Sequence, residues 1–197
     1  MSIFKTYTLL CLHLLARTIS ATAPEPIAGF TVIWAEDFSG PALNTTNWTR
    51  WTGISSNNEQ ETYTTSPTTC ALTGTDSFLI TPQRTNGQWT SCRIETNPSF
   101  AATPGSQLIV QARMKLGTPG AALQGIWPAF WSLGQAMREG TPWPACGEID
   151  TMENVNGAAL GYGTIHCGAA CNDPTGLSAG IAFDYGAYHT WAHAIDL

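Results

Sequence analysis

The chain has 197 residues, enough for one domain, and only 11% of them are charged, against roughly 25% in an ordinary soluble domain. The formal net charge of −6 excludes a strongly basic surface, and with it the usual means of binding nucleic acid. Eight tryptophans are many for this length, so we expect some in the core and some as flat platforms for ligands.

The first 23 residues have the pattern of a secretory signal peptide. Lys5 supplies a positive start, residues 6–16 form an apolar run, and Ala21-Thr22-Ala23 offers small residues for cleavage. The apolar run is about half the roughly 20 residues that a membrane span needs. We therefore expect a secreted protein, extracellular or in a cell wall, with no membrane span and with residues 24–197 as its domain.

Cysteine usage agrees with an oxidising compartment, where cysteines pair. Cys70 and Cys92 flank an expected hairpin, and Cys167 and Cys171 are close enough in sequence to close a small loop. The count after the leader is odd, so one thiol is free or lacks its partner. Two consecutive sequons, Asn44-Thr45-Thr46 and Asn47-Trp48-Thr49, also fit secretion.

Short runs of β-branched and aromatic residues alternate with Gly and Pro, which predicts an all-β sandwich or barrel. In the clearest run, Leu108, Val110, Ala112 and Met114 fall on one face, as in a half-buried strand. Asn86-Gly87 predicts a tight turn, and so a hairpin over residues 77–96. The expected strands are residues 31–38, 77–84, 88–96, 107–116 and 125–133.

The run over residues 125–133 is apolar on both faces, which is typical of a central strand. Trp127 and Trp131 are four residues apart and share a face. Pro128 lies between them and has no N–H to donate to a neighbouring strand. We expect a bulge or an unpaired position to accommodate it.

The segment CGEIDTMEN, residues 146–154, concentrates three carboxylates in a chain with few charges. In a regular strand Glu148 and Asp150 share a face, whereas Glu153 points the opposite way. One extra residue, a β-bulge, would turn Glu153 back beside the other two. Ile149 and one or both of Thr151 and Met152 would then face the core.

With the bulge, Glu148 and Glu153 are four steps apart, roughly 13 Å along a strand. Leaning side chains would bring the two carboxyl groups to about 5–6 Å, near the separation in a retaining glycosidase. Clustered carboxylates also differ in pKa, so that one keeps a proton while another is ionised. The alternatives are a calcium site and a solvated acidic edge.

At this motif the sequence resembles the laminarinase-like members of glycoside hydrolase family 16, of the kind found in fungi. The resemblance runs from about Phe30 to the last residue and rests on seven segments in the family's order. They are WAEDFSG, NNEQETYT, SCRIET, GIWPAFWSLG, WPACGEIDTMENVNG, YGTIHC and YHTWA.

The resemblance implies a β-jelly-roll sandwich of two antiparallel sheets whose concave sheet forms a glycan cleft. It implies endo-hydrolysis of β-1,3- or mixed β-1,3/1,4-glucan with retention, by a monomer that requires no cofactor, with a structural calcium as an option. By resemblance, Glu148 is the nucleophile, Glu153 the general acid/base and Asp150 the residue that tunes the nucleophile. The implied substrate-binding residues are Trp127, Trp131, His166, Arg93, Asn58 and Glu59.

Several of the binding residues also have a purely structural interpretation. Trp127 and Trp131 fit core positions, and His166 fits a buried, hydrogen-bonded histidine. Arg93 lies in phase with Glu95 and would form a solvated ion pair with it. In the family, the strand containing residues 188–192 lies well before the end of the domain. We therefore expect the domain to be C-terminally truncated.

Three functions follow from these residues. The leading one is a secreted retaining endo-β-glucanase. The second is a glucan transglycosylase, although relatives of that kind usually have the shorter motif without a bulge. The third is a non-catalytic glucan-binding protein or an inactive fragment, although relatives that only bind typically lack one or both glutamates.

Overall fold

The computed structural model describes residues 23–54, 57–118 and 123–197, and the predicted signal peptide lies outside them except for Ala23. Within these ranges helical structure is limited to short 3-10 turns, which confirms the all-β prediction. The elements are β1 Trp48–Arg50, β2 Gly53–Ile54, β3 Glu61–Tyr63, β4 Cys70–Leu72, β5 Phe78–Ile80, β6 Gln83–Thr85, β7 Gln88–Ser91, β8 Ile94–Thr96, β9 Gln107–Met114, β10 Ala129–Leu133, η2 Gln135–Glu139, β11 Glu148–Glu153, β12 Leu160–His166, η3 Ala169–Cys171, β13 Leu177–Ala182 and β14 His189–Asp196.

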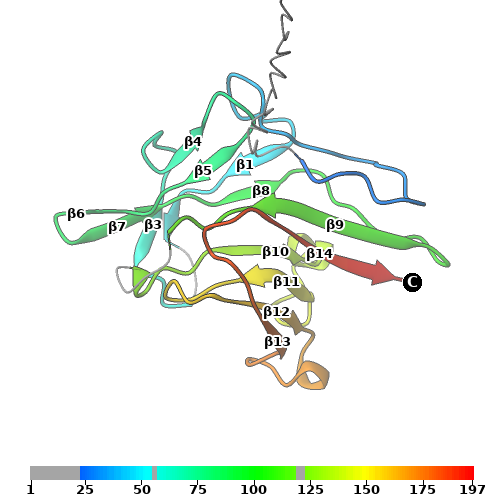
Figure 1. Cartoon of the computed structure of the whole chain (residues 1–197). Coiled ribbons are helices and arrows are strands. Elements are labelled where there is room, and N and C mark those ends of the chain that lie inside the picture. Colours follow the sequence, from blue (N-terminus) through cyan, green and yellow to red (C-terminus); the bar gives the residue numbers. More distant parts are fainter. Residues whose placement is uncertain (1–22, 55–56, 119–122) are drawn as a thin grey trace, which may run out of the picture.

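One antiparallel sheet contains β10, β11, β12 and β13 in that spatial order, and in Figure 1 it lies below the long strand β9. β9 and β14 pair with each other along eight residues. The other strands form the sheet β2-β3-β7-β6 and the pairs β1-β8 and β4-β5. The pairing of β3 with β7 is parallel, which differs from the expected purely antiparallel arrangement.

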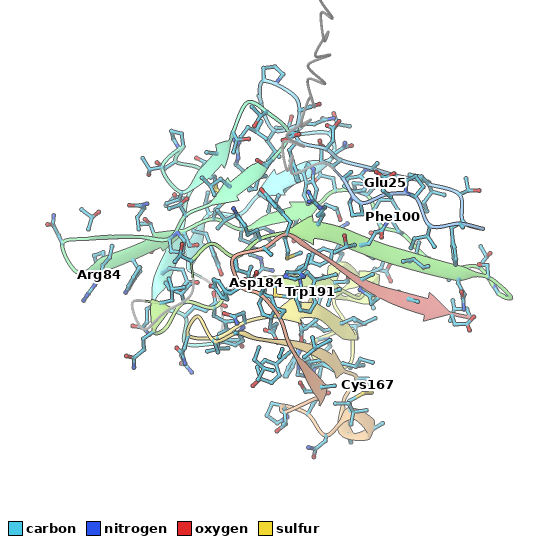
Figure 2. All side chains as sticks on the ribbon, viewed as in Figure 1. Glu25, Arg84, Phe100, Cys167, Asp184 and Trp191 are labelled. Carbon is cyan, nitrogen blue, oxygen red and sulfur yellow. A yellow bond between two sulfur atoms is a disulfide. The ribbon has the colours of Figure 1, made fainter. Side chains whose placement is uncertain are left out.

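The two layers meet where β14 covers β11 and β12. Trp191 of β14 packs so closely on Gly161 of β12 that a Cβ atom there would lie 2.5 Å from the indole ring (Figure 2). His193 of β14 hydrogen-bonds with Thr151 of β11. Only a glycine on β12 leaves room for the indole, so the position of β14 depends on the absence of a side chain at residue 161.

The pairing of β9 with β14 agrees with the face predicted for its apolar residues, although β9 is half-buried on both faces after its first residue. Val110 lies opposite His193 and Ala112 lies opposite Trp191, and both β14 residues face the four-stranded sheet. β14 alternates regularly between half-buried and exposed positions. The apolar face of β9 therefore continues the inner surface of the second layer, as period-two patterning requires.

The Asn86-Gly87 turn is confirmed, but the hairpin around it is shorter than predicted. β6 and β7 pair antiparallel across the turn, whose two residues have φ of 51° and 82°. The outer segments leave the hairpin, because β5 pairs with β4 and β8 pairs with β1. The disulfide Cys70–Cys92 joins β4 to the segment after β7 and confirms that pairing.

The strand predicted over residues 31–38 is wrong. The segment forms no strand, and Val32 and Ile33 are exposed. Its anchor is Trp34, whose ring lies 5.6 Å from that of Trp48 and 5.5 Å from that of Phe100. A left-handed Phe38, with φ of 54°, ends the extended course of the backbone.

The strand predicted over residues 125–133 is shorter and lies at the edge of its sheet rather than in the centre. β10 begins at Ala129, directly after Pro128, so the missing N–H falls outside the ladder. The carbonyl of Pro128 still accepts a hydrogen bond from the N–H of Asn154. Pro128 is therefore the unpaired position that was expected. The register shift between Phe130 and Trp131 skips Thr151 of β11 and belongs to the bulge of that strand.

Candidate active site

The three carboxylates of β11 face the same side of the four-stranded sheet. The register of β11 with β12 shifts between Asp150 and Glu153, which confirms the predicted bulge. Residues directly opposite each other in an antiparallel pair share a face. Across β10, β11 and β12 the three rows are Leu133–Glu148–His166, Trp131–Asp150–Thr164 and Ala129–Glu153–Tyr162.

The bulge also buries the residues between the acids. Met152 is 1% exposed and Thr151 is 7% exposed. The Thr151 hydroxyl lies 2.7 Å from Nδ1 of His193 on the opposite layer. This agrees with the prediction that one or both of these side chains face the core.

Each glutamate accepts a hydrogen bond from a different tryptophan. Nε1 of Trp127 donates to Oε1 of Glu153 over 2.8 Å, and Nε1 of Trp143 donates to Oε2 of Glu148 over 2.6 Å. Trp127 and Trp143 are 52% and 39% exposed. Both rings therefore hold a carboxylate while leaving much of their surface open to a ligand. Trp127 was predicted from the sequence, whereas Trp143 was not.

Burial and mutual repulsion perturb the acids. Asp150 is 6% exposed, and its burial, together with the charges of Glu153 and Glu148, raises its pKa to about 7 against a partial offset from His166. Burial also raises the pKa of Glu153, although the Trp127 hydrogen bond opposes this and the charge of Glu148 reinforces it. A glutamic acid that keeps its proton at higher pH than usual is suited to be a general acid.

His166 of β12 lies between two aspartates. Its Nε2 is 3.4 Å from Oδ2 of Asp150, and its Nδ1 donates to Oδ1 of Asp173. Burial alone would lower the pKa of His166, but the Asp173 hydrogen bond and the charges of Asp150 and Glu148 outweigh burial and raise that pKa. His166 therefore interacts directly with the cluster of carboxylates on β11. Asp173 was not predicted from the sequence.

Glu95, which the sequence suggested as the ion-pair partner of Arg93, has a different partner. Glu95 instead pairs with Arg138 over 2.6 Å. The Arg93 guanidinium lies between two indoles, 4.9 Å from the ring of Trp51 and 4.7 Å from that of Trp131. Because Trp131 lies opposite Asp150 on the acid-bearing face, the stack borders the carboxylates.

Asn58 and Glu59 lie in the connection between β2 and β3. Asn58 is exposed in a left-handed conformation, with φ of 57°. Glu59 accepts a hydrogen bond from the Tyr63 hydroxyl over 2.9 Å. Their role in substrate binding stays a prediction.

Nitrogen and oxygen atoms of Glu148, Asp150 and His166 lie within 4.8 Å of one another, a spacing that a metal ion also accepts. The side chains are nevertheless engaged in other ways. Glu148 accepts from Trp143, and His166 is bound through Nδ1 to Asp173. Hydrogen bonding to Trp143 and Asp173 therefore accounts for the positions of Glu148 and His166 without an ion.

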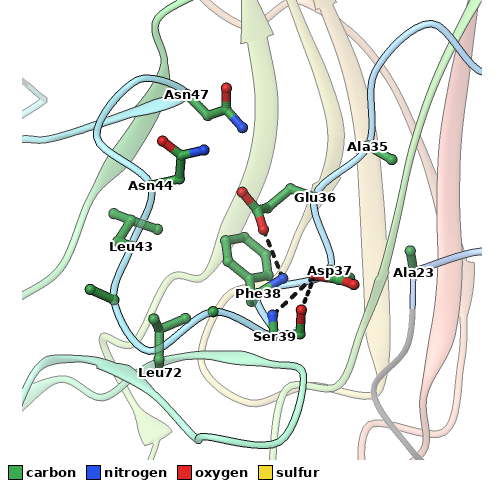
Figure 3. Close-up of a pocket in the computed structure, with 12 residues that line it drawn as sticks. Ala23, Ala35, Glu36, Asp37, Phe38, Ser39, Leu43, Asn44, Asn47 and Leu72 are labelled. Atoms are coloured by element: carbon green, nitrogen blue, oxygen red, sulfur yellow. Dashed lines mark hydrogen bonds between the residues drawn. The ribbon is translucent and has the colours of Figure 1, made fainter.

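A hollow of about 490 Å³ lies elsewhere, beside the segment containing Glu36 and Asp37 (Figure 3). The two carboxylates accept hydrogen bonds from the N–H groups of Phe38 and Ser39. None of the three acids of β11 lines this hollow.

Among the described residues no helix is both long and apolar enough to cross a membrane.

Residues 42–181 match the model of a protein family described as the XgeA-like, catalytic GH16 domain. The chain is 31% identical over 198 residues to glucan endo-1,3-beta-glucosidase A1 of Niallia circulans, an alignment covering 89% of this chain and 27% of that protein. It is 37% identical over 106 residues to a beta-1,3-glucan-binding protein of Penaeus monodon, covering 50% of this chain and 25% of that protein.

Among solved structures, the endo-1,3-β-glucanase of Streptomyces sioyaensis superposes with a TM-score of 0.82 at 36% identity. The match covers 88% of this chain and 70% of that one. The agreement confirms the predicted β-jelly-roll. The chain spans only about a quarter of the length of the curated relatives named above.

Proposed function

Since the chain belongs to glycoside hydrolase family 16, we propose that it is a secreted, monomeric endo-β-glucanase that cleaves β-1,3- or mixed β-1,3/1,4-glucan with retention. The observation that carries the proposal is the arrangement of Glu148 and Glu153. Both lie on one face of the sheet with Asp150 between them, and each is held by its own indole N–H.

In the first step Glu153, in its acid form, gives its proton to the glycosidic oxygen. The bond between that oxygen and the anomeric carbon breaks while the Glu148 carboxylate forms an ester with the same carbon. In the second step the Glu153 carboxylate takes a proton from water. The water oxygen bonds to the anomeric carbon, and the ester to Glu148 breaks.

The environment of each glutamate suits its role. The raised pKa of Glu153, caused first by burial, favours the proton that the first step needs. Glu148 accepts the Trp143 hydrogen bond, which fixes the direction of the attacking carboxyl group. The chemistry is complete with side chains and water, so we propose that turnover needs no cofactor. A calcium ion in this fold would be structural.

The substrate assignment rests on the relatives and on the surface beside the acids. The relative from Niallia circulans is a glucan endo-1,3-beta-glucosidase. The exposed ring of Trp127 and the stack of Arg93 between Trp51 and Trp131 offer flat and cationic surfaces beside the carboxylates. Sugar rings pack well on such surfaces.

The deciding experiment compares wild type with Glu148→Gln on laminarin and lichenan, with products separated by size. We expect Glu148→Gln to lower kcat by at least about a thousandfold because it removes the nucleophile. Glucan binding should persist. The control is Glu139→Gln, an exposed glutamate of η2, which should keep wild-type activity. A rate retained in Glu148→Gln would exclude the assignment of the nucleophile.

Glucan binding without cleavage is the second candidate, favoured by the similarity to the Penaeus monodon protein. It predicts that the wild type binds laminarin and releases no shorter product. Transglycosylation predicts products longer than the oligosaccharide supplied. One incubation followed by product sizing separates all three functions.

A further inference from the structure

The Asp173 carboxylate is almost entirely occupied by contacts around His166. Its Oδ1 accepts from Nδ1 of His166, and its Oδ2 accepts from the N–H groups of Cys167 and Gly168. Its side chain is only 5% exposed. Burial opposes ionisation, but these hydrogen bonds outweigh it and hold the pKa of Asp173 below its ordinary value. A carboxylate in this state binds the proton on Nδ1.

A short cross-linked loop brings this carboxylate to the histidine. The disulfide Cys167–Cys171 closes the chain directly after β12, and Asp173 follows it by two residues (Cys167 is labelled in Figure 2). Gly176 also lies against the ring, where a Cβ atom would be 2.7 Å from Cε1 of the imidazole. The ring is thus held by a carboxylate and by backbone.

Nε2, the second nitrogen of the ring, faces the carboxylates of β11. Nε2 of His166 lies 3.4 Å from Oδ2 of Asp150, and the charges of Asp150 and Glu148 both act on the ring. The titratable groups around His166 are Asp150 and Glu148 of β11 and Asp173 of the loop, with Glu153 of β11 farther along the same face. All of them are acidic, so a positive imidazolium is the charge that this site favours.

We propose that Asp173 is a positioning residue that fixes the proton and the orientation of His166 and thereby places a positive charge beside Asp150. This inference rests on the proposed function for its catalytic consequence, but not for its physical content. Asp173 touches neither substrate nor reacting atoms. Its effect reaches the two glutamates only through the imidazole and Asp150.

The test that needs no substrate is an NMR titration of the histidines in the full chain, with His166 assigned by comparison with His166→Gln. In wild type we expect His166 to titrate above its ordinary value of about 6.5. In Asp173→Asn its midpoint should fall by roughly one pH unit, because an opposite charge in contact has been removed. A wild-type midpoint below the ordinary value overturns the proposal, even if Asp173→Asn does not fold.

The control is Asp184→Asn. Asp184 also accepts a backbone N–H, that of Gly186, but lies in the connection before β14 (Figure 2). It should leave the His166 titration unchanged. A midpoint that stays at the wild-type value in Asp173→Asn also refutes the proposal.

The catalytic part is tested by a double-mutant cycle on laminarin. Asp173→Asn should lower kcat by about tenfold in the wild-type background, since the imidazole loses its fixed geometry. In the His166→Gln background the same change should have almost no further effect, because Asp173 acts only through the ring. Losses that multiply would show that Asp173 acts independently and would overturn this part. A wild type without activity would instead refute the proposed function and leave the titration result standing.

Discussion

The hydrogen bond from Trp127 to Glu153 can be removed while keeping an aromatic ring, by Trp127→Phe. The indole N–H lies 2.8 Å from Oε1 and opposes the rise in the pKa of Glu153 that burial causes. A hydrogen bond to a charged group contributes about 1.5–3 kcal/mol. Trp127 is 52% exposed, so water replaces part of the lost hydrogen bond. We therefore expect its removal to cost about 1 kcal/mol. At about 1.36 kcal/mol per pH unit, the pKa of Glu153 should rise by roughly 0.7.

The assay is kcat/KM for laminarin from about pH 4 to pH 9, whose alkaline limb reports loss of the proton from the general acid. Trp127→Phe should move this limb to higher pH by roughly 0.7 units. Trp48→Phe is the matched control, because its indole also donates to a carboxylate, that of Glu36, away from the three acids of β11. It should leave the limb in place. An alkaline limb that is fixed or moves to lower pH in Trp127→Phe would refute the assignment of Glu153 as the acid.

Two further predictions concern stability. The pKa of Asp150 is raised from 3.8 to about 7, so its stabilising contribution is complete below pH 3.8 and is lost as pH rises through about 7. Across that pH interval the free energy of unfolding of wild type, measured with urea, should fall by up to about 4 kcal/mol more than that of Asp150→Asn. The same pH dependence in both proteins would contradict this. At Gly134 a Cβ atom would lie 1.8 Å from the carbonyl oxygen of Cys146, so Gly134→Ala should cost about 3 kcal/mol or more and lower Tm. Gly163→Ala, with its nearest contact at 3.5 Å, should cost much less, and equal losses would count against a steric cause.

The bulge was predictable because the chemistry of the motif demanded it. Alternation alone turns Glu153 away from Glu148, and one extra residue is the smallest change that reunites them. The apolar face of β9 and the Asn86-Gly87 turn were predictable for the same reason, since short-range periodicity and turn chemistry decide them. In each case the signal lies within about ten residues.

Features decided by contacts between distant segments were not predictable. The residues around Trp34 favour a strand by composition, but ring contacts with Trp48 and Phe100 anchor them instead. Trp143 and Asp173 reach the acid group from loops, where no periodicity fixes direction. A partial signal existed for Asp173, because the closely spaced Cys167 and Cys171 indicated a loop that folds back near His166.

The extra residue in β11 has a consequence for how firmly the acids are held. A strand without it, with a glutamate two positions after Asp150, would also present three acids on one side. The additional position gives two adjacent buried side chains, Thr151 and Met152, behind the acids. Through His193, Thr151 fastens the reverse side of this strand to β14. Separation of the two layers would therefore displace the acids directly. On heating, catalytic activity and the packing between the layers should be lost together.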